Sequence, residues 1–320
     1  MLTVVIPTYN RPDYLAESLA SVARQTLPEF RLVVLDNASE LDNSGALAAA
    51  GSRPVEYVRN PFNVGNTNIG KAMKEYSDGQ FLVVFHDDDV MHPRMLELEM
   101  EVLQSDPEVQ FVATEYVWFR DGESPPVEAF EAPVQPAEVF DDAAALVRAL
   151  LGGADLCFGS AAYRSSVLHE IEADLGRFGS YTDRPFLLDA ARHGKCALLR
   201  GPLVLYRVHP GQDTLTGGLE IENLIELLKE YRDVLPQPLD EADQHLFYGY
   251  AASFLATNYL RLPKDRRHGA VALFRACRKA GVLRLKDTDL GWWATLLRAD
   301  GLGWLIDPLV GFKRVLGRRR

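Results

Sequence analysis

Three consecutive aspartates are the residues of this chain best suited to chemistry. Asp87, Asp88 and Asp89 follow the apolar run 81–85, with only His86 between, and this run has the composition of a buried strand. Adjacent carboxylates repel one another, and a fold tolerates them at a buried sheet edge when a hard cation or many hydrogen bonds offset their charge. The triplet therefore indicates a divalent-metal site. The alternative is a solvated acidic turn that precedes a helix starting near Pro93.

The acids must be positioned by strands and helices that alternate along the first half of the chain. Short β-branched or aromatic runs predict strands, and apolar residues at helical spacing between them predict helices. The strands are expected at 3–7, 32–35, 55–59 and 81–85, and the helices at 12–24 and 68–76. Near-continuous hydrophobicity is typical of parallel strands covered on both faces. Such βαβ sheets bind ligands at the carboxyl ends of their strands, where the acid triplet lies.

The rest of the chain is predicted to become progressively helical. A proline-rich loop is expected at 121–136, a break at Gly152 and Gly153, and a stretch of small residues at 159–162. Further strands are predicted at 110–118 and 197–206, and helices at 141–151, 184–193, 221–234, 241–262, 266–280 and 290–298. A boundary near Gly217 and Gly218 divides the chain into domains 1–217 and 218–320.

Composition narrows the class of protein. With 320 residues and 47% hydrophobic side chains, the chain can bury a large core. Its formal net charge of −11 argues against a nucleic-acid partner, because duplex binding depends on cations that neutralise phosphates. Cys157, Cys196 and Cys277 are far apart and form no CxxC pair, which favours a reducing compartment. Strand-like residues directly after Met1 indicate a core strand rather than a signal peptide, so a cytoplasmic location is predicted.

The C-terminal tail mixes aromatic and basic side chains. Trp292, Trp293 and Trp304 are interspersed with cations, and the chain ends in three arginines. Aromatic rings favour the membrane interface and cations favour acidic lipid, so the tail is a candidate for peripheral contact with the inner face of the cell membrane. A packed C-terminal helix with a frayed basic end is the alternative. This helical region equally suits an acceptor site or a homo-oligomer interface.

Polar side chains follow the other predicted strands at the same edge of the sheet. Thr8, Tyr9 and Arg11 come after the first strand, where donors can meet a nucleotide. Asp36 ends the second strand and can accept from a base N–H or a ribose hydroxyl, or it can simply cap a turn. The stretch 59–70 is rich in asparagine and glycine, which suits a turn that leads into a helix N-terminus near an anion.

Taken in order, these segments resemble the family 2 glycosyltransferases of the GT-A fold. The resemblance rests on the opening V-V-I-P-T-Y-N-R at 4–11, the acid Asp36, the N-V-G turn at 63–65 and the F-H-D-D-D-V-M-H-P segment at 85–93. It covers residues 2–209. It implies an α/β, Rossmann-like fold with a mainly parallel sheet flanked by helices, followed by a helical C-terminal region.

The resemblance also implies roles for individual residues. The nucleotide-sugar would be bound by residues at the strand ends, namely Pro7, Thr8, Tyr9, Arg11, Asp36, Asn63, Asn68, Asp87 and Asp88. The cofactor would be Mn²⁺ or Mg²⁺, held by Asp89, the favoured ligand, with Asp87 and His209. Such an ion stabilises charge on the leaving diphosphate. His209 is equally explained as an ordinary turn residue after a strand.

Asp183 is the predicted catalytic base. Inverting members of the family use a carboxylate at the start of a helix to deprotonate the acceptor hydroxyl, and the matching segment here is Y-T-D-R-P-F at 181–186. A helix cap is the simpler explanation, and both roles can coexist. Three positions depart from the family pattern: His86 and Thr182 stand where many relatives have acids, and the residue before Asn68 is not the common arginine.

The function implied is metal-dependent, inverting transfer of a hexosyl or deoxyhexosyl unit from a nucleotide-sugar donor. The acceptor would be a hydroxyl of a glycan or lipid-linked saccharide in cell-surface polysaccharide biosynthesis. The alternative is a noncatalytic nucleotide- or glycan-binding relative of the same fold, which would be expected to lack the acids. A sugar-1-phosphate nucleotidyltransferase is disfavoured because residues 7–12 contain no glycine, and a processive synthase because the chain has no spanning segment.

Overall fold

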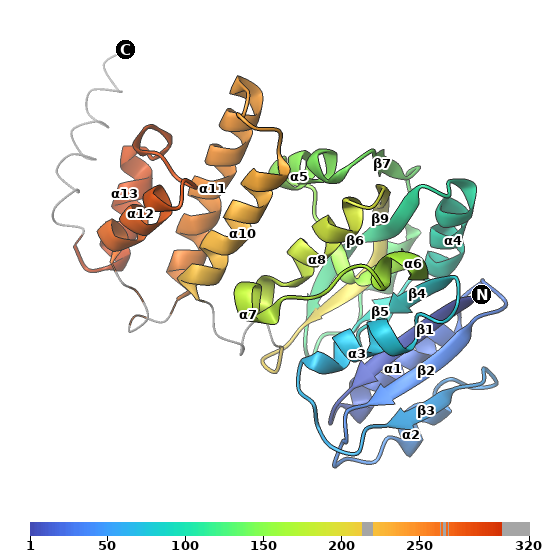
Figure 1. Ribbon diagram of the computed structural model, residues 1–320. Helices are drawn as coiled ribbons and strands as arrows, with labels where there is room; N and C mark the ends of the chain where they lie inside the picture. The colour runs from blue at the N-terminus through green and yellow to red at the C-terminus, as the bar shows by residue number, and fades with distance from the viewer. Residues whose placement is uncertain (213–219, 263, 265–266, 268, 303–320) are drawn as a thin grey trace. The chain divides into compact units, whose positions relative to one another are not determined.

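The computed structural model describes residues 1–212, 220–262, 264, 267 and 269–302 (Figure 1). The chain divides into two compact units. The first comprises Met1–Leu146, Asp155–Ala173 and Phe186–Gln212, and the second comprises Val147–Ala154, Asp174–Pro185 and Asp213–Arg320. The predicted boundary at Gly217 and Gly218 lies outside the described residues. The division into domains 1–217 and 218–320 stays a prediction.

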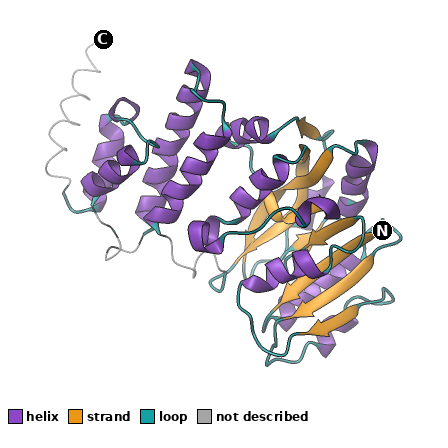
Figure 2. Ribbon diagram, in the orientation of Figure 1, coloured by secondary structure: helices purple, strands orange, loops and turns teal. Residues whose placement is uncertain are grey.

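The first unit is built on one sheet with helices packed against it (Figure 2). Its strands are β1 Leu2–Thr8, β2 Arg31–Asp36, β3 Glu56–Arg59, β4 Phe81–Val84, β5 Val90–Met91, β6 Val109–Arg120, β7 Glu138–Phe140, β8 Cys157–Arg164 and β9 Lys195–Val208. The strand order is β3-β2-β1-β4-β8-β6-β9-β5, and β7 pairs with β9.

The first four strands form the predicted parallel βαβ arrangement. β1 pairs in parallel with β2 and β4, and β2 pairs in parallel with β3. The connecting helices are α1 Pro12–Ala23, α2 Ser44–Ala48 and α3 Thr67–Glu75. Leu15 and Leu19 of α1 pack against strand residues such as Ile6, and all three are fully buried. The register sets Thr8 beside Asp36, so the polar residues that end these strands meet at one edge.

Beyond β4 the sheet is mixed rather than parallel. β8 lies between β4 and β6 and runs antiparallel to both, whereas β6 and β9 are parallel. β5 and β7 pair antiparallel with β9. The expected parallel pairing therefore holds throughout β3-β2-β1-β4 and between β6 and β9, whereas the other pairs are antiparallel. The small residues 159–162 gave no strand signal, yet they form the middle of β8, where Ala161 and Ala162 are fully buried.

Helix α4, Met95–Ser105, packs on the sheet and buries a carboxyl group in the core. Glu99 is fully buried, and neither of its side-chain oxygens has a hydrogen-bond partner. Burial raises the pKa of Glu99 well above its ordinary value, because the charged form loses its hydration. The folded protein therefore keeps a proton on Glu99 that the unfolded chain releases above about pH 4.5.

Glu99→Met is expected to raise the free energy of unfolding at pH 7 by about 1–3 kcal/mol, because it removes a buried polar group that has no partner. The gain in the free energy of unfolding should shrink as the pH falls toward 4.5. Glu99 then begins to take up a proton in the unfolded chain too, so unfolding no longer gains free energy from releasing that proton. Chemical denaturation at both pH values measures this. The matched control is Glu101→Met on the exposed side of α4, which should change little. A gain of equal size at both pH values would contradict the prediction.

The second unit is helical in its described part. Among the described residues, the α-helices that begin at or after residue 143 are α5 Ala143–Leu151, α6 Ser165–Leu168, α7 Leu175–Phe178, α8 Asp183–Ala191, α10 Ile221–Val234, α11 Glu241–Arg261, α12 Ala270–Lys279 and α13 Leu290–Ala299. Of these, α6 belongs to the first unit, and α5 and α8 cross from one unit to the other. The predicted helices are confirmed, with ends that differ by a few residues, except that the predicted start at residue 266 lies outside the described residues.

Part of the C-terminal tail packs inside this helical unit. Trp292 of α13 is buried, and its indole Nε1 donates to the carbonyl oxygen of Ala252 at 2.8 Å. Leu296 is fully buried as well. The aromatic side chain at 292 therefore supports the packed-helix interpretation, whereas Trp304 and the terminal arginines lie outside the described residues. Among the described residues, no helix is both long enough and apolar enough to cross a membrane.

Candidate functional site

The acid triplet begins three residues after β4 and is held by the last residue of β1 and by the segment that follows β1. Thr8 donates from Oγ1 to Oδ2 of Asp87 at 2.7 Å. Arg11 donates from Nη1 to Oδ1 of Asp87 at 3.3 Å and to Oδ2 of Asp88 at 3.0 Å. The three aspartates are buried. The structure thus brings together residues that are more than 70 positions apart in the chain, because β1 and β4 are parallel neighbours in the sheet.

The segment that follows β9 contacts the same acids and Arg11. His209 is buried, and its Nε2 lies 2.9 Å from Oδ2 of Asp88. Arg11 also donates from Nη2 to the carbonyl oxygen of Gly211 at 2.8 Å, which ties the segment after β9 to the segment after β1. The predicted approach of His209 to the acid cluster is therefore present as a contact with Asp88.

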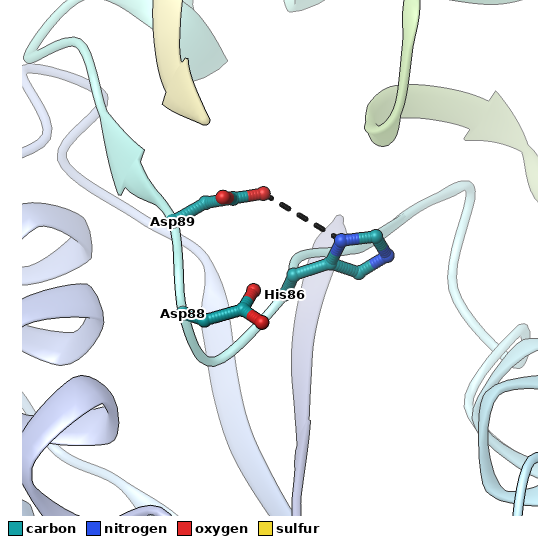
Figure 3. Close-up of side chains that lie close together, drawn as sticks. All are labelled: His86, Asp88 and Asp89. Atoms are coloured by element: carbon teal, nitrogen blue, oxygen red, sulfur yellow. Dashed lines mark ion pairs between the residues drawn. The ribbon is translucent and has the colours of Figure 1, made fainter. Parts of the chain in front are cut away.

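Three side chains could share one metal ion. His86, Asp88 and Asp89 each offer one ligand atom, and these three atoms lie within 4.8 Å of one another (Figure 3). Oδ1 of Asp89 accepts from the backbone N of Arg207 at 2.9 Å. Its Oδ2 is buried without a hydrogen-bond partner and lies 3.5 Å from Nδ1 of His86. A cation would satisfy this oxygen.

The metal-compatible group differs from the set predicted from the sequence. Asp89 belongs to both sets, but Asp87 and His209 lie outside the group that the geometry selects. His86, one of the departures from the family pattern, takes part instead. Its ring packs against β8, where a Cβ at Gly159 would lie 2.9 Å from Nδ1 of His86. Only glycine at 159 leaves room for this ring.

The four side chains influence each other's protonation. Burial alone lowers the pKa of His86, but the nearby aspartates outweigh this effect and raise the pKa to about 9. Burial and the charge of Asp88 raise the pKa of Asp87 to about 6. Burial also raises the pKa of Asp89. For Asp88, burial is outweighed by the contact with His209 and by nearby positive charge, which hold its pKa below the ordinary value. Three carboxylates are thus buried together, and neighbouring positive groups offset part of their charge, an environment in which a cation can replace a proton.

Arg207 holds the acidic segment from β9. Besides the backbone contact to Asp89, its side-chain Nε donates to the carbonyl oxygen of Asp88 at 3.0 Å. Its Nη2 forms an ion pair with Glu17 of α1. The guanidinium is almost fully buried between two aromatic rings, those of Tyr14 and Phe119. The sequence showed Arg207 only as a neighbour of His209, because its contacts depend on residues that are distant along the chain, such as Glu17 and Asp88.

Asp36 forms a second polar centre at the ends of β2 and β3. Its Oδ1 accepts from the backbone N and the hydroxyl of Ser39. Its Oδ2 accepts from the hydroxyl of Tyr57 at 2.6 Å and lies 3.4 Å from Nε of Arg59. Asp36 is fully buried. Any ligand that binds here would therefore contact a carboxylate that already accepts hydrogen bonds from Ser39 and Tyr57. The position of Asp36 at the end of a strand did not predict these bonds.

The predicted asparagines belong to a network of amides beside this centre. Asn37 donates to Oδ1 of Asn63 at 2.8 Å, and Asn60 donates to Oδ1 of Asn68 at 2.8 Å. Asn68 in turn donates to the carbonyl oxygen of Leu35. Asn63 and Asn68 therefore fix the loop between β3 and α3.

Two predicted contacts lie on or directly after β1. Pro7 is part of the strand and is in register with Leu35 of β2. Tyr9 follows the strand, and its side chain is 39% exposed. Tyr9 therefore offers an aromatic ring to a ligand at this edge, whereas Pro7 contributes mainly to the sheet.

Asp183, the predicted base, is the first residue of α8 and belongs to the second unit. Its Oδ1 accepts from the backbone N of Arg184 at 2.8 Å. Thr182 donates to the carbonyl oxygen of Gly179 at 2.7 Å. Asp183 is half-buried at the start of a helix. Its roles as base and as helix cap stay predictions.

Comparison with known proteins identifies the family. The model for glycosyl transferase family 2 matches residues 3–172, more than half of the chain. The chain belongs to glycosyl transferase family 2. This confirms the resemblance found in the sequence, and the matched residues of this family 2 protein include the acid triplet and the ends of the first four strands.

Relatives and solved structures agree with this membership. A glycosyltransferase of Nostoc sp. is 24% identical over 65% of this chain and 65% of its own length. S. aureus TarS 1–349 in complex with UDP-GlcNAc has a TM-score of 0.62 and 17% identity, covering 94% of this chain and 89% of TarS. The mannosyltransferase PcManGT of Pyrobaculum calidifontis, in complex with GDP-Man and Mn²⁺, has a TM-score of 0.50 and 19% identity, covering 97% and 84%.

These similarities establish the fold. The predicted α/β GT-A architecture is confirmed, with the mixed sheet described above. The chain spans 37%, 65% and 28% of the length of three curated relatives that it matches.

Proposed function

We propose that this family 2 protein transfers a sugar from a nucleotide-sugar donor to an acceptor hydroxyl with the help of a divalent cation. The observation that carries the proposal is Oδ2 of Asp89, a buried carboxylate oxygen that has no hydrogen-bond partner and only an ion pair at 3.5 Å with His86, beside Asp88. Such an oxygen is costly to bury unless a cation binds it. PcManGT, which shares the fold, is described with GDP-Man and Mn²⁺, and this supports the assignment.

His86, Asp88 and Asp89 are the side chains that would hold the cation. Carboxylate oxygens suit both Mg²⁺ and Mn²⁺, whereas an imidazole nitrogen is a more usual ligand of first-row transition ions, so this set favours Mn²⁺. When bound, the ion neutralises the donor diphosphate and stabilises charge on the leaving group. Arg11 adds a fixed positive charge at the same place, because its partly exposed guanidinium contacts Asp88 and Asp87.

The protein's other residues orient the nucleoside. Tyr9 offers its exposed ring to the face of the base, since aromatic rings stack readily on bases. Asp36, held by Ser39 and Tyr57, gives this corner a negative charge that attracts a base N–H or a ribose hydroxyl. The asparagine network that includes Asn63 and Asn68 fixes the neighbouring loop.

Asp183 is proposed to accept the proton of the acceptor hydroxyl. The hydroxyl oxygen then attacks the anomeric carbon from the side opposite the leaving diphosphate, which inverts the configuration there. The position of Asp183 at the start of α8 supports this role, because it matches the family position of the base. The acceptor is proposed to be a glycan or lipid-linked saccharide of a cell-surface polysaccharide pathway.

Arg207 is expected to position the metal ligands. Arg207→Lys should weaken Mn²⁺ binding roughly 10–100-fold, because a single ammonium cannot contact both Glu17 and the carbonyl oxygen of Asp88. Titration with Mn²⁺ followed by electron paramagnetic resonance measures this. Arg164→Lys, whose guanidinium bonds backbone carbonyls elsewhere in the first unit, is the matched control. A folded Arg207→Lys protein with wild-type Mn²⁺ affinity would refute the positioning role.

Calorimetric titration with UDP, GDP, CDP and dTDP, each with and without Mn²⁺, tests the proposed function. Tight binding of at least one diphosphate only in the presence of metal is the expected result, and its nucleobase narrows the list of donors. Transfer from the matching nucleotide-sugar then tests catalysis. Absence of binding to all four diphosphates would favour the noncatalytic alternative.

A further inference from the structure

The described helical unit carries a concentration of positive charge that the donor site does not use. Residues 267–286 contain no aspartate or glutamate, although the formal net charge of the whole chain is −11. The lysines and arginines of this segment are Arg267, Arg275, Arg278, Lys279, Arg284 and Lys286. Such a local reversal of charge in an acidic protein points to an anionic partner.

Helix α12 presents part of this charge on its outer face. Its inner face packs into the helical unit through Leu273, Phe274 and Cys277, which are buried. Val271, at 48% exposure, and Arg275 and Arg278, which are also exposed, occupy the opposite face. The helix is therefore amphipathic, with apolar and cationic side chains together on the solvent side.

A cavity of about 380 Å³ lies where α12 ends and the 3₁₀ helix Leu285–Asp287 begins. Arg278, Leu285 and Lys286 line it. Leu285 is 64% exposed between two cations. Within the described part of the chain, Arg278 and Lys286 make no side-chain hydrogen bond and no ion pair, so their charges are available to a partner.

Arg284, which also lines the cavity, is already neutralised and acts as a scaffold. It donates from Nε to Oδ2 of Asp287 at 2.7 Å, and its guanidinium stacks 3.5 Å from the ring centre of Tyr248. Cations in the last turn of a helix also interact favourably with its carbonyl groups, which accounts for Arg278 and Lys279. This interaction with the helix end does not explain why Leu285 is exposed beside Lys286, or why Val271 is exposed on the cationic face of α12.

We propose that the basic patch, defined as Val271, Arg275, Arg278, Leu285 and Lys286, docks this protein on an anionic lipid bilayer. Cations attract acidic head groups, and the exposed apolar side chains insert into the interface. A soluble polyanion would use the cations but would gain nothing from Val271 and Leu285, so the bilayer is favoured. The proposal does not depend on donor chemistry.

Vesicle co-sedimentation of the full chain tests the proposal. The protein should sediment with vesicles that contain phosphatidylcholine and phosphatidylglycerol, but not with phosphatidylcholine alone, and sodium chloride should weaken binding through screening. The variant Arg278→Glu/Lys286→Glu should bind at least about tenfold more weakly, since each cation near an anionic surface strengthens binding roughly fivefold. Leu285→Ser should weaken binding at high salt as well.

The control variant Lys74→Glu/Arg94→Glu makes the same change in net charge on the first unit and should bind vesicles like wild type. Diphosphate binding by the patch variant, measured by calorimetry, shows that the protein is folded and keeps the two proposals separable. The docking proposal is overturned if wild type ignores anionic vesicles, if the patch variant binds them as well as wild type, or if soluble heparin is bound tightly while vesicles are not.

Discussion

Asp89→Ala is expected to abolish metal-dependent binding of a nucleoside diphosphate. Asp89 is the member of the acid triplet whose Oδ2 is buried without a hydrogen-bond partner, with His86 as its ion-pair partner at 3.5 Å. This oxygen is therefore the one most available to a cation. Changes to residues that merely support metal ligands cost 10–100-fold in affinity, and loss of a ligand should cost at least about a hundredfold. Calorimetric titration with Mn²⁺ measures the loss of metal affinity, and titration with the diphosphate in the presence of Mn²⁺ measures the loss of diphosphate affinity.

Asp89→Asn separates the loss of charge from the loss of structure. Asparagine can still accept from the backbone N of Arg207 through its Oδ1, so the segment should keep its conformation. It lacks the negative charge that a divalent cation needs, and metal binding should fail as in the alanine variant. Asp78→Ala, an exposed aspartate on the same unit, is the control. Wild-type diphosphate affinity in Asp89→Ala with Mn²⁺ present would disprove the assignment.

Asp183→Asn is expected to stop sugar transfer while leaving donor binding intact. General base catalysis by a positioned side chain contributes roughly 10²–10⁴-fold to a rate, and asparagine cannot accept the proton. The substitution keeps the size of the side chain and an oxygen that can accept from the backbone N of Arg184. The helix start should therefore persist. The transfer rate at saturating donor, together with the calorimetric affinity for the diphosphate, distinguishes the two effects.

Asp189→Asn on the same helix is the matched control for Asp183. Asp189 forms an ion pair with Arg192 at the surface of α8, so its neutralisation should leave transfer unchanged. If the Asp183→Asn variant transferred sugar at the wild-type rate, Asp183 would not be the catalytic base. Equal losses of donor binding and transfer would instead indicate that Asp183 supports the fold of α8.

Much of the candidate site could be predicted from the sequence because its signals are local. The strand β4 is a continuous apolar run, and the acids begin three residues after its end, so hydrophobicity placed Asp87, Asp88 and Asp89 near a strand end. The same reasoning placed Thr8 and Asp36 at the ends of β1 and β2. Parallel strands align their carboxyl ends, so these residues had to share one edge.

The tertiary structure alone decided which groups would contact one another. The contact between His209 and Asp88 and the hold of Arg207 on the acidic segment join residues more than 100 positions apart, and no local pattern encodes such a pairing. The antiparallel strand β8 is a further example. Its small residues give no strand signal, yet Gly159 is what leaves space for the ring of His86.

The sequence by itself therefore determined the family, the βαβ half of the sheet and the edge where the polar residues gather. These features follow from the order of apolar and polar residues along the chain. Only the tertiary structure decided that His86 joins Asp88 and Asp89, and that Asp87 is held by Thr8 and Arg11. The physical reason is that the chemistry of a buried carboxylate depends on the donors that surround it, and those donors come from distant segments that only folding brings together.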